Sequence, residues 1–216
     1  MDNQYSIGII SEGVTDQIIL EAILVTYLGN KDLPITRLQP KENESGNWDK
    51  VFKYCKSDDF KQAFHFLHWV IIQVDTDFMR RKDVPKEYLI DIENLSTTKI
   101  IEAFRTLLID LIGDDFYEQY AQQIIFAIAV DAIECWLLPI YYQDNKAKKT
   151  TNCLGTLNQI LPQTEGFAID EKKANYYEKI AKHFKKRDTV VKCSAKNESF
   201  KHFLDQLSII LSPPSH

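Results

Sequence analysis

The sequence predicts an α/β protein in which a parallel sheet has helices on both faces and is followed by a mostly helical C-terminal portion. Three apolar runs, at 5–11, 69–74 and 124–130, are too short for lone helices and too apolar for surface loops, so they are typical of buried strands. Segments with apolar residues at helical spacing separate these runs, and strands that alternate with helices favour a parallel sheet.

The α/β core is expected to span residues 1–140. Its first strand runs into the pair Glu12-Gly13, and Thr15 or Asp16 is expected to cap the helix that follows. A weaker strand and two further helical patterns complete this core. The expected elements are strands at 5–11, 35–39, 69–74 and 124–130, and helices that begin near residue 15 and cover 48–67 and about 97–112.

Residues 141–216 are expected to form a mainly helical extension that packs on the core, so that 1–216 make a single domain. A chain of 216 residues with 44% hydrophobic residues is long enough to bury one compact core. Asn197 is placed to cap the last helix, whose apolar residues recur at helical spacing. The expected elements are helices at about 153–161, 171–184 and 198–211, and one strand at 189–193.

Charge is divided unevenly along the chain. The net charge is -5, but residues 141–216 hold 13 Lys and Arg against 8 Asp and Glu, a balance of +5 that leaves -10 for residues 1–140. A basic surplus of this kind is either a solvated surface or a face that contacts nucleic-acid phosphates. Five lysines of the extension are candidates for nucleic-acid binding: Lys182, Lys185, Lys186, Lys192 and Lys196.

Cysteine usage and hydropathy favour a cytoplasmic protein. Cys55, Cys135, Cys153 and Cys193 stand singly, so the sequence predicts neither a disulfide framework nor a zinc site. No apolar run approaches the roughly 20 residues of a membrane span, and the first residues lack the basic and apolar regions of an export signal. We therefore expect no membrane partner.

All three clear strands run into acidic residues. Glu12 follows the first, Asp75 and Asp77 end the second, and Asp131 with Glu134 follow the third. Each acid taken alone is equally explained as a helix cap or turn residue. In an open α/β sheet, however, parallel strands end at one edge, where carboxylates would repel each other by several kcal/mol unless a cation intervened. Oxygen-only ligands suit Mg²⁺ or Mn²⁺, which serve phosphoryl chemistry.

Two motifs built on these strand ends resemble the Toprim domain, which topoisomerases, primases and the overcoming-lysogenization-defect nucleases share. The first is the strand that runs into Glu12-Gly13 with Asp16 shortly after it, and the second is the strand that ends in Asp-Thr-Asp at 75–77. Two later pieces, at 132–138 and 198–204, resemble small stand-alone Toprim-like bacterial proteins, which are often encoded beside an ATPase and linked to phage defence.

The resemblance implies a Toprim-like sheet and a Mg²⁺- or Mn²⁺-dependent nuclease, or a nuclease-like effector subunit, that cleaves DNA or RNA in anti-phage defence with an ATPase partner. In this scheme Glu12 would be the acid/base group and a metal ligand, and Asp75 and Asp77 would hold the metal. Asp16 and Glu134 are further candidate ligands.

Two other readings of the same residues stay open. One is a haloacid-dehalogenase-like phosphatase, in which Asp75 would be the nucleophile and Asp77 the general acid/base. Against this reading, that motif normally opens its fold, whereas here a strand and a helix precede it. The other is a catalytically silent module that keeps the fold and uses its basic face to bind nucleic acid or a partner protein.

Overall fold

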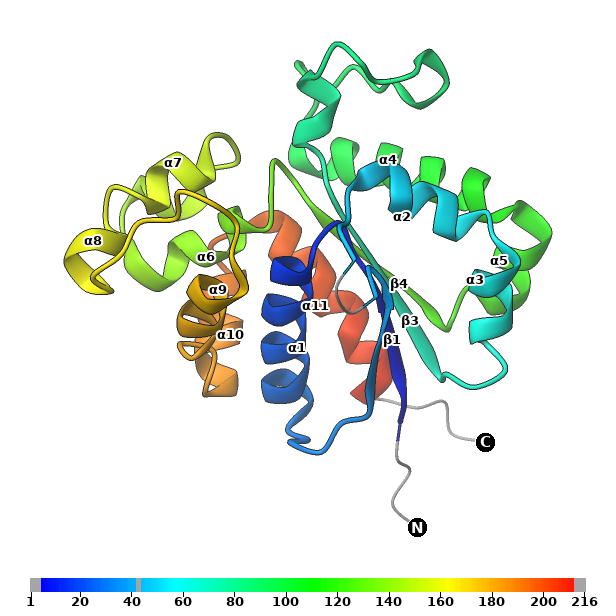
Figure 1. Cartoon of the computed structure of the whole chain (residues 1–216), viewed down its shortest axis with the longest axis horizontal. Coiled ribbons are helices and arrows are strands. Elements are labelled where there is room, and N and C mark those ends of the chain that lie inside the picture. Colours follow the sequence, from blue (N-terminus) through cyan, green and yellow to red (C-terminus); the bar gives the residue numbers. More distant parts are fainter. Residues whose placement is uncertain (1–4, 42–43, 212–216) are drawn as a thin grey trace.

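The centre of the molecule is a four-stranded parallel sheet with the strand order β2-β1-β3-β4 (Figure 1). It is seen in a computed structural model that describes residues 5–41 and 44–211. The strands are β1 (Ile7–Ile10), β2 (Ile35–Gln39), β3 (Trp69–Asp75) and β4 (Ile124–Ala129). The predicted α/β fold with a parallel sheet is therefore confirmed, and each predicted core strand lies within two residues of its expected bounds.

Alternate residues of the central strands feed two hydrophobic clusters, one on each face of the sheet, as the two-residue period of a strand requires. Ile7, Ile9 and Ile71 pack into one cluster, whereas Ile10 and Ile72 pack into the other. Every residue of β1 and β4 is buried. This burial on both faces explains why these strands are uninterrupted apolar runs in the sequence.

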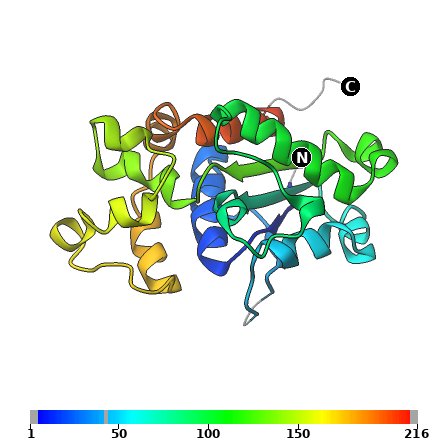
Figure 2. The same cartoon turned by 90° about the horizontal axis from the view of Figure 1, so that it is seen from above.

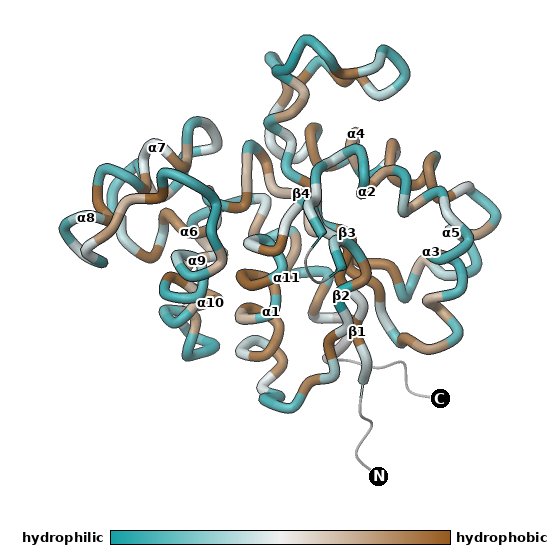
Figure 3. Tube along the Cα trace, viewed as in Figure 1, coloured by the Kyte–Doolittle hydropathy of each residue, from teal (hydrophilic) through white to brown (hydrophobic). Residues whose placement is uncertain are grey.

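Helices cover both faces of the sheet, as predicted (Figure 1). The helices packed on the face of Ile10 and Ile72 are α2 (Trp48–Cys55), α3 (Asp58–Ala63), α4 (Thr97–Ile112) and α5 (Asp114–Tyr120). The other face is covered by α1 (Val14–Leu28) and α11 (Glu198–Leu211). Figure 3 shows that α1 is mostly hydrophobic, in keeping with a helix enclosed between the sheet and further helices.

The helices between residues 134 and 194 lie beyond α1, away from the sheet, in both views of the molecule (Figure 2). They are α6 (Glu134–Tyr141), at the end of the core, and the extension helices α7 (Cys153–Leu157), α8 (Leu161–Thr164), α9 (Ala174–Ala181) and α10 (Arg187–Ser194). Short 3-10 turns lie at Asp77–Arg80 and Lys86–Tyr88 in the core and at Asn145–Lys148 in the extension. Tyr177 and Val190 belong to the same hydrophobic cluster as Ile7 and Ile9, so the extension packs on the core through apolar contacts.

The last helix joins the extension to the sheet. Asn197 Oδ1 accepts a hydrogen bond from the Phe200 N–H at 3.0 Å, so the predicted cap is confirmed. Gln206 on α11 exchanges two hydrogen bonds with the backbone of Phe126 in β4, the edge strand, at 3.1 and 2.8 Å. The side chain thus satisfies backbone groups that an edge strand otherwise leaves to solvent.

Two local predictions are wrong. Residues 189–193 form part of helix α10 rather than a strand. Val190 and Cys193 are buried while Val191 is exposed, a three-residue period that a helix produces and a strand does not. Helix α1 begins at Val14 after Gly13, so Thr15 and Asp16 lie inside its first turn and neither is its cap.

Helices α5 and α6 were not predicted, and three predicted helices differ from prediction in their bounds. The expected helix at 48–67 is divided into α2 and α3, the one at 153–161 into α7 and α8, and the one at 171–184 is shortened to α9. Within the part of the chain that the structure describes, no helix has both the length and the hydropathy that a bilayer crossing requires.

Candidate metal centre

Five acidic side chains gather where the strands end. Glu12 lies just after β1, Asp16 lies in the first turn of α1, and Asp75 is the last residue of β3. Asp77 begins the turn that follows β3, and Glu134 begins α6 after β4. Because the sheet is parallel, these positions share its carboxyl edge, and the mutual influence of their charges places them near one another. The five predicted metal-ligand candidates thus share one edge of the sheet, but among the described residues no three of them have ligand atoms within 4.8 Å of one another.

A ring of hydrogen bonds joins Glu12 to Asp75. The Asp75 N–H donates to Glu12 Oε1 at 2.9 Å, and the Glu12 N–H donates to Gln73 Oε1 at 3.2 Å. The Gln73 side chain in turn donates to Asp75 Oδ1 at 2.7 Å, and the Ile133 N–H donates to the same oxygen at 3.0 Å. The ends of β1 and β3 and the loop after β4 are therefore held in one arrangement.

Asp16 and Glu134 are the most deeply buried acids of the cluster, with 2% and 0% of their surface exposed. Asp16 Oδ1 and Glu134 Oε2 have no hydrogen-bond partner among the described residues. Burying a carboxylate oxygen without a partner costs free energy, because its charge loses the stabilisation by water and its hydrogen bonds to water are lost. The two oxygens therefore identify a place where a positively charged ligand would be strongly stabilised.

Lys172 is the basic residue of the cluster, and it comes from the loop before α9. Its Nζ lies 2.9 Å from Glu134 Oε1 and 3.9 Å from Asp75 Oδ2. The Tyr177 hydroxyl, from α9, donates to the same Glu134 oxygen. The loop before α9 and α9 itself thus supply these two contacts to Glu134.

Burial and mutual repulsion raise the pKa values of these acids. Desolvation, with the charge of Asp16, raises the pKa of Glu12 to about 8, and desolvation raises that of Asp16 to about 7 despite the nearby Lys172. Desolvation and the charges of Asp16 and Glu12 raise the pKa of Asp75 well above its usual range, and partial desolvation raises that of Asp77. Burial alone would lower the pKa of Lys172, but Glu134 and Asp75 outweigh it and raise the value.

A cavity of about 380 Å³ lies beside the acids and is lined by Glu12, Asp16, Asp75, Lys172 and the loop at 44–47. Gly46 brings this loop against the backbone of Glu12. A Cβ at position 46 would lie 1.9 Å from the Glu12 carbonyl oxygen, so no other residue fits without moving the loop. Glycine at position 46 therefore allows the loop at 44–47 to pack against Glu12 and line the cavity.

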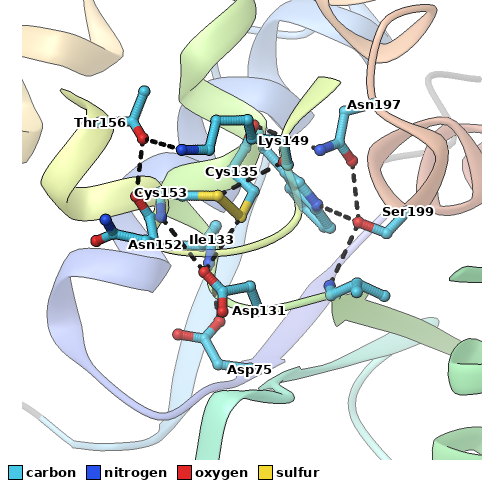
Figure 4. The surroundings of a disulfide bond; sticks show 12 residues. Asp75, Asp131, Ile133, Cys135, Lys149, Asn152, Cys153, Thr156, Asn197 and Ser199 are labelled. Atoms are coloured by element: carbon cyan, nitrogen blue, oxygen red, sulfur yellow. Dashed lines mark hydrogen bonds between the residues drawn. A yellow bond between two sulfur atoms is a disulfide. The ribbon is translucent and has the colours of Figure 1, made fainter. Parts of the chain in front are cut away.

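Asp131, which also follows a strand end, has a different environment from these five acids. Its carboxylate forms an ion pair with Arg80. The same carboxylate accepts a hydrogen bond from the Cys153 N–H at 3.4 Å (Figure 4). Its backbone N–H donates to Thr76 Oγ1 at 2.9 Å, and its φ of 71° is in the left-handed region. Asp131 therefore has partners that hold the loop after β4.

Cys135 and Cys153 form a disulfide, so the expectation of no disulfide was wrong (Figure 4). Their spacing of 18 residues matches no cysteine motif, and only the packing of α7 on α6 brings them together. Asp131 and these two sulfurs lie within 4.8 Å of one another, the one such group of possible metal ligands in the described part of the chain. Both sulfurs are engaged in the disulfide, so this group is not free to bind a metal.

The five predicted nucleic-acid-binding lysines lie away from the acidic cluster. Lys185 and Lys186 follow Phe184, whose carbonyl accepts from Thr26 Oγ1 at 2.5 Å near the end of α1. Ten residues of helix, or about 15 Å, separate Thr26 from Asp16. Lys182 ends α9 and Lys192 lies on α10, and Lys196 bonds Gln143 just beyond α6. The structure thus places Lys192 on α10 and the other four lysines in the segments that follow α9 and α10, apart from the carboxylates.

Sequence reasoning missed three side chains that contact the acids. Lys172 is one of many lysines in a basic segment, and nothing in the sequence separates it from the exposed Lys173. Gln73 lies inside an apolar strand, where its polarity was the one available signal, and Tyr177 belongs to an ambiguous pair with Tyr176.

Comparison of the chain with family models, curated proteins and solved structures found no match.

Proposed function

We propose that this protein is a Mg²⁺- or Mn²⁺-dependent nuclease, of the Toprim-like type that its sequence motifs resemble. The observation that carries the proposal is the cluster of Glu12, Asp16, Asp75, Asp77 and Glu134 at the carboxyl edge of a parallel sheet. Unpartnered oxygens on Asp16 and Glu134 support it, because burying them without a cation costs free energy that a structural role does not explain.

The donor set fits a hard divalent ion. The cluster contains carboxylate oxygens only, the ligands that Mg²⁺ and Mn²⁺ prefer, and the nearest sulfur ligands are held in a disulfide. When bound, such an ion neutralises charge on a phosphoryl group and lowers the pKa of coordinated water. We assign Glu12, Asp75 and Asp77 as its principal ligands, with Asp16 and Glu134 completing the charge of the site.

Glu12 is suited to proton transfer as well as to metal binding. It is half-buried at the wall of the 380 Å³ cavity, and burial raises its pKa to about 8. One of its oxygens accepts from the Asp75 N–H, which fixes the orientation of the carboxylate. A carboxyl group with a pKa near the working pH takes or gives a proton with little cost, as general acid/base catalysis requires.

Binding of the nucleic acid is assigned to lysines of the extension. Lys182, Lys185 and Lys186 lie about 15 Å or more from the acids along α1, a distance that four or five base pairs cover. One duplex would therefore reach both places. Association with a separately encoded ATPase and a role in phage defence rest on the sequence resemblance alone.

The surroundings of Asp75 disfavour the phosphatase. A nucleophilic aspartate needs a free oxygen that faces the substrate. Asp75 is 4% exposed, its Oδ1 accepts two hydrogen bonds, and its Oδ2 lies 3.9 Å from Lys172. These contacts leave neither oxygen of Asp75 free to attack a phosphate ester, whereas a metal ion that displaced Lys172 would reach Oδ2.

The test is cleavage of end-labelled single-stranded DNA, duplex DNA and RNA with Mg²⁺, Mn²⁺ or a chelator. We expect cleavage that the chelator stops, and loss of more than 100-fold activity in Glu12→Gln. Glu87→Gln, which changes an exposed glutamate outside the cluster, should cut like the wild type. A folded wild-type protein that cuts none of the three substrates with either ion, yet binds them, would favour the catalytically silent binding module.

A further inference from the structure

Lys172 is the residue of the acidic cluster that the proposed function leaves without a role. It is a cation placed where a divalent ion is expected, 2.9 Å from Glu134 Oε1 and 3.9 Å from Asp75 Oδ2. Its charge also acts on Asp16, whose pKa it lowers. The lysine therefore offsets part of the buried negative charge of the cluster.

One ammonium group is a poor match for three carboxylates. Lys172 contacts one oxygen of Glu134, while Glu134 Oε2 and Asp16 Oδ1 have no partner among the residues that the structure describes. A divalent ion carries twice the charge and takes six or more oxygen ligands, so it satisfies such a cluster better. An ion held by Asp75, with the charge of Glu134 beside it, would also lie close to the ammonium, and the two cations would repel each other.

The side chain of Lys172 reaches the surface, whereas the two acids that it contacts are buried. Its side chain is 43% exposed and borders the 380 Å³ cavity, on a loop outside any helix or strand. Asp75 and Glu134, by contrast, are buried at the ends of β3 and α6. A flexible four-carbon stem lets the ammonium swing into solvent without disturbing the backbone.

We propose that Lys172 is a built-in counter-cation that a divalent metal ion displaces from Glu134 and Asp75, so that metal binding turns its ammonium group toward the open cavity. This inference rests on the proposed metal site and adds a position for Lys172 in each state. The displaced ammonium then faces the side from which a phosphate group would approach the metal.

Amine acylation tests the displacement directly on the wild-type protein. A succinimidyl ester is applied in brief pulses without metal and with saturating Mn²⁺, and the modification of each lysine is measured by peptide mass spectrometry. An ammonium held by buried carboxylates reacts slowly, so we expect Mn²⁺ to speed acylation of Lys172 at least threefold. Lys173, an exposed neighbour paired with Glu171, is the internal control and should not change.

Mn²⁺ affinity of matched variants, measured by calorimetry, provides the second readout. We expect Lys172→Met to bind Mn²⁺ at least tenfold more tightly than the wild type, because no cation competes. Lys172→Arg should stay close to the wild type, since it retains a competing charge, and Lys173→Met should be unchanged. Should Lys172→Met fail to fold, Lys172→Gln replaces it, and the acylation experiment needs no variant.

The outcomes separate this inference from the proposed function. Acylation of Lys172 that stays constant or slows with Mn²⁺ would overturn displacement, even if Lys172→Met bound the ion more tightly, because its charge would then act from a fixed position. Equal or weaker affinity in Lys172→Met would also overturn it. A folded wild-type protein that binds no Mn²⁺ at all would instead refute the metal site itself.

Discussion

The backbone N–H of Asp75 donates a hydrogen bond to Glu12 Oε1 at 2.9 Å, and this contact fixes the ends of two neighbouring strands to each other. β1 and β3 are paired in parallel from Ile7 and Trp69 onward, so Glu12 and Asp75 leave the sheet side by side. The relationship makes the two acids one unit: a change at either position alters the orientation or the charge of the other.

The raised pKa values predict that the metal-free protein loses stability as the pH rises from about 5 to 8. In this window the folded state keeps protons on Glu12 and Asp16, whose pKa values are about 8 and 7, while the unfolded chain has released them. Because the folded state binds more protons, the free energy of unfolding falls with rising pH, by on the order of a few kcal/mol. Urea denaturation at several pH values in a chelator measures it.

Two comparisons identify the source of this pH dependence. Mg²⁺ should flatten the curve by stabilising the protein most at pH 8, where the acids are ionised. Asp16→Asn should make the free energy of unfolding of the metal-free protein depend less steeply on pH, because one of the titrating groups is gone. A stability that rises between pH 5 and 8 without metal would contradict the clustering of these carboxylates.

Asparagine and alanine at position 75 are expected to behave differently. Removal of one charge from the cluster relieves repulsion, which favours both variants. Asp75 Oδ1, however, accepts hydrogen bonds from Gln73 and from the Ile133 N–H. Asp75→Asn keeps an acceptor there, so its metal-free stability should match or exceed that of the wild type. Asp75→Ala leaves a buried N–H without an acceptor, so its free energy of unfolding should fall by about 1 to 3 kcal/mol.

Thermal unfolding without metal compares the two variants at position 75. Asp59→Asn, on the exposed surface of α3, is the control for removing a charge outside the cluster. Both variants at position 75 should lose metal-dependent cleavage. Equal stability of Asp75→Asn and Asp75→Ala would show that the two hydrogen bonds contribute nothing.

The disulfide predicts the thiol count of the oxidised protein. Unfolded without reductant, the chain should show two reactive thiols, Cys55 and Cys193, and after reduction it should show four. Closing a loop of this length stabilises a fold by about 3 kcal/mol in the chain-entropy account, so reduction should lower the unfolding free energy by a similar amount. In a reducing compartment the pair would be thiols. Four thiols in protein purified without reductant would contradict the bond.

Charge reversal of Lys182, Lys185 and Lys186 tests the assigned nucleic-acid face. If all three contact phosphates, the slope of log affinity against log salt should fall by about 2 to 3 for duplex DNA. Mn²⁺ affinity should barely change, since about 15 Å exceeds the screening length of about 8 Å at physiological salt. The control reverses three lysines of the opposite helix layer: Lys53, Lys61 and Lys99. Equal slopes for both triple variants would mean that the face is only solvated.

The strands and the strand-end acids could be predicted because their signals are local. Ile124 to Ala129 is an unbroken apolar run, since parallel pairing and helices bury it on both sides. The strand predicted at 189–193 was wrong because β-branched Thr189, Val190 and Val191 favour a strand when only local sequence is considered. In the structure this segment belongs to α10, whose packing against α6 and α11 selects a helix.

The later motifs at 132–138 and 198–204 meet in the structure. Trp136 Nε1 donates to Ser199 Oγ at 2.9 Å, and the Trp136 ring stacks on Phe200 at 4.9 Å. Their pattern therefore serves packing between α6 and α11, which supports Glu134 at the start of α6. Lys172, Gln73 and the disulfide lay beyond prediction because each depends on contacts between distant segments.

The most direct test of the metal centre is a crystal structure of the protein soaked in Mn²⁺, with anomalous scattering used to locate the ion. We predict one strong peak within coordinating distance of Glu12, Asp75 and Asp77, with Lys172 withdrawn from Glu134. A saturating soak with no peak among these carboxylates, or with a peak at Asp131 instead, would contradict the account.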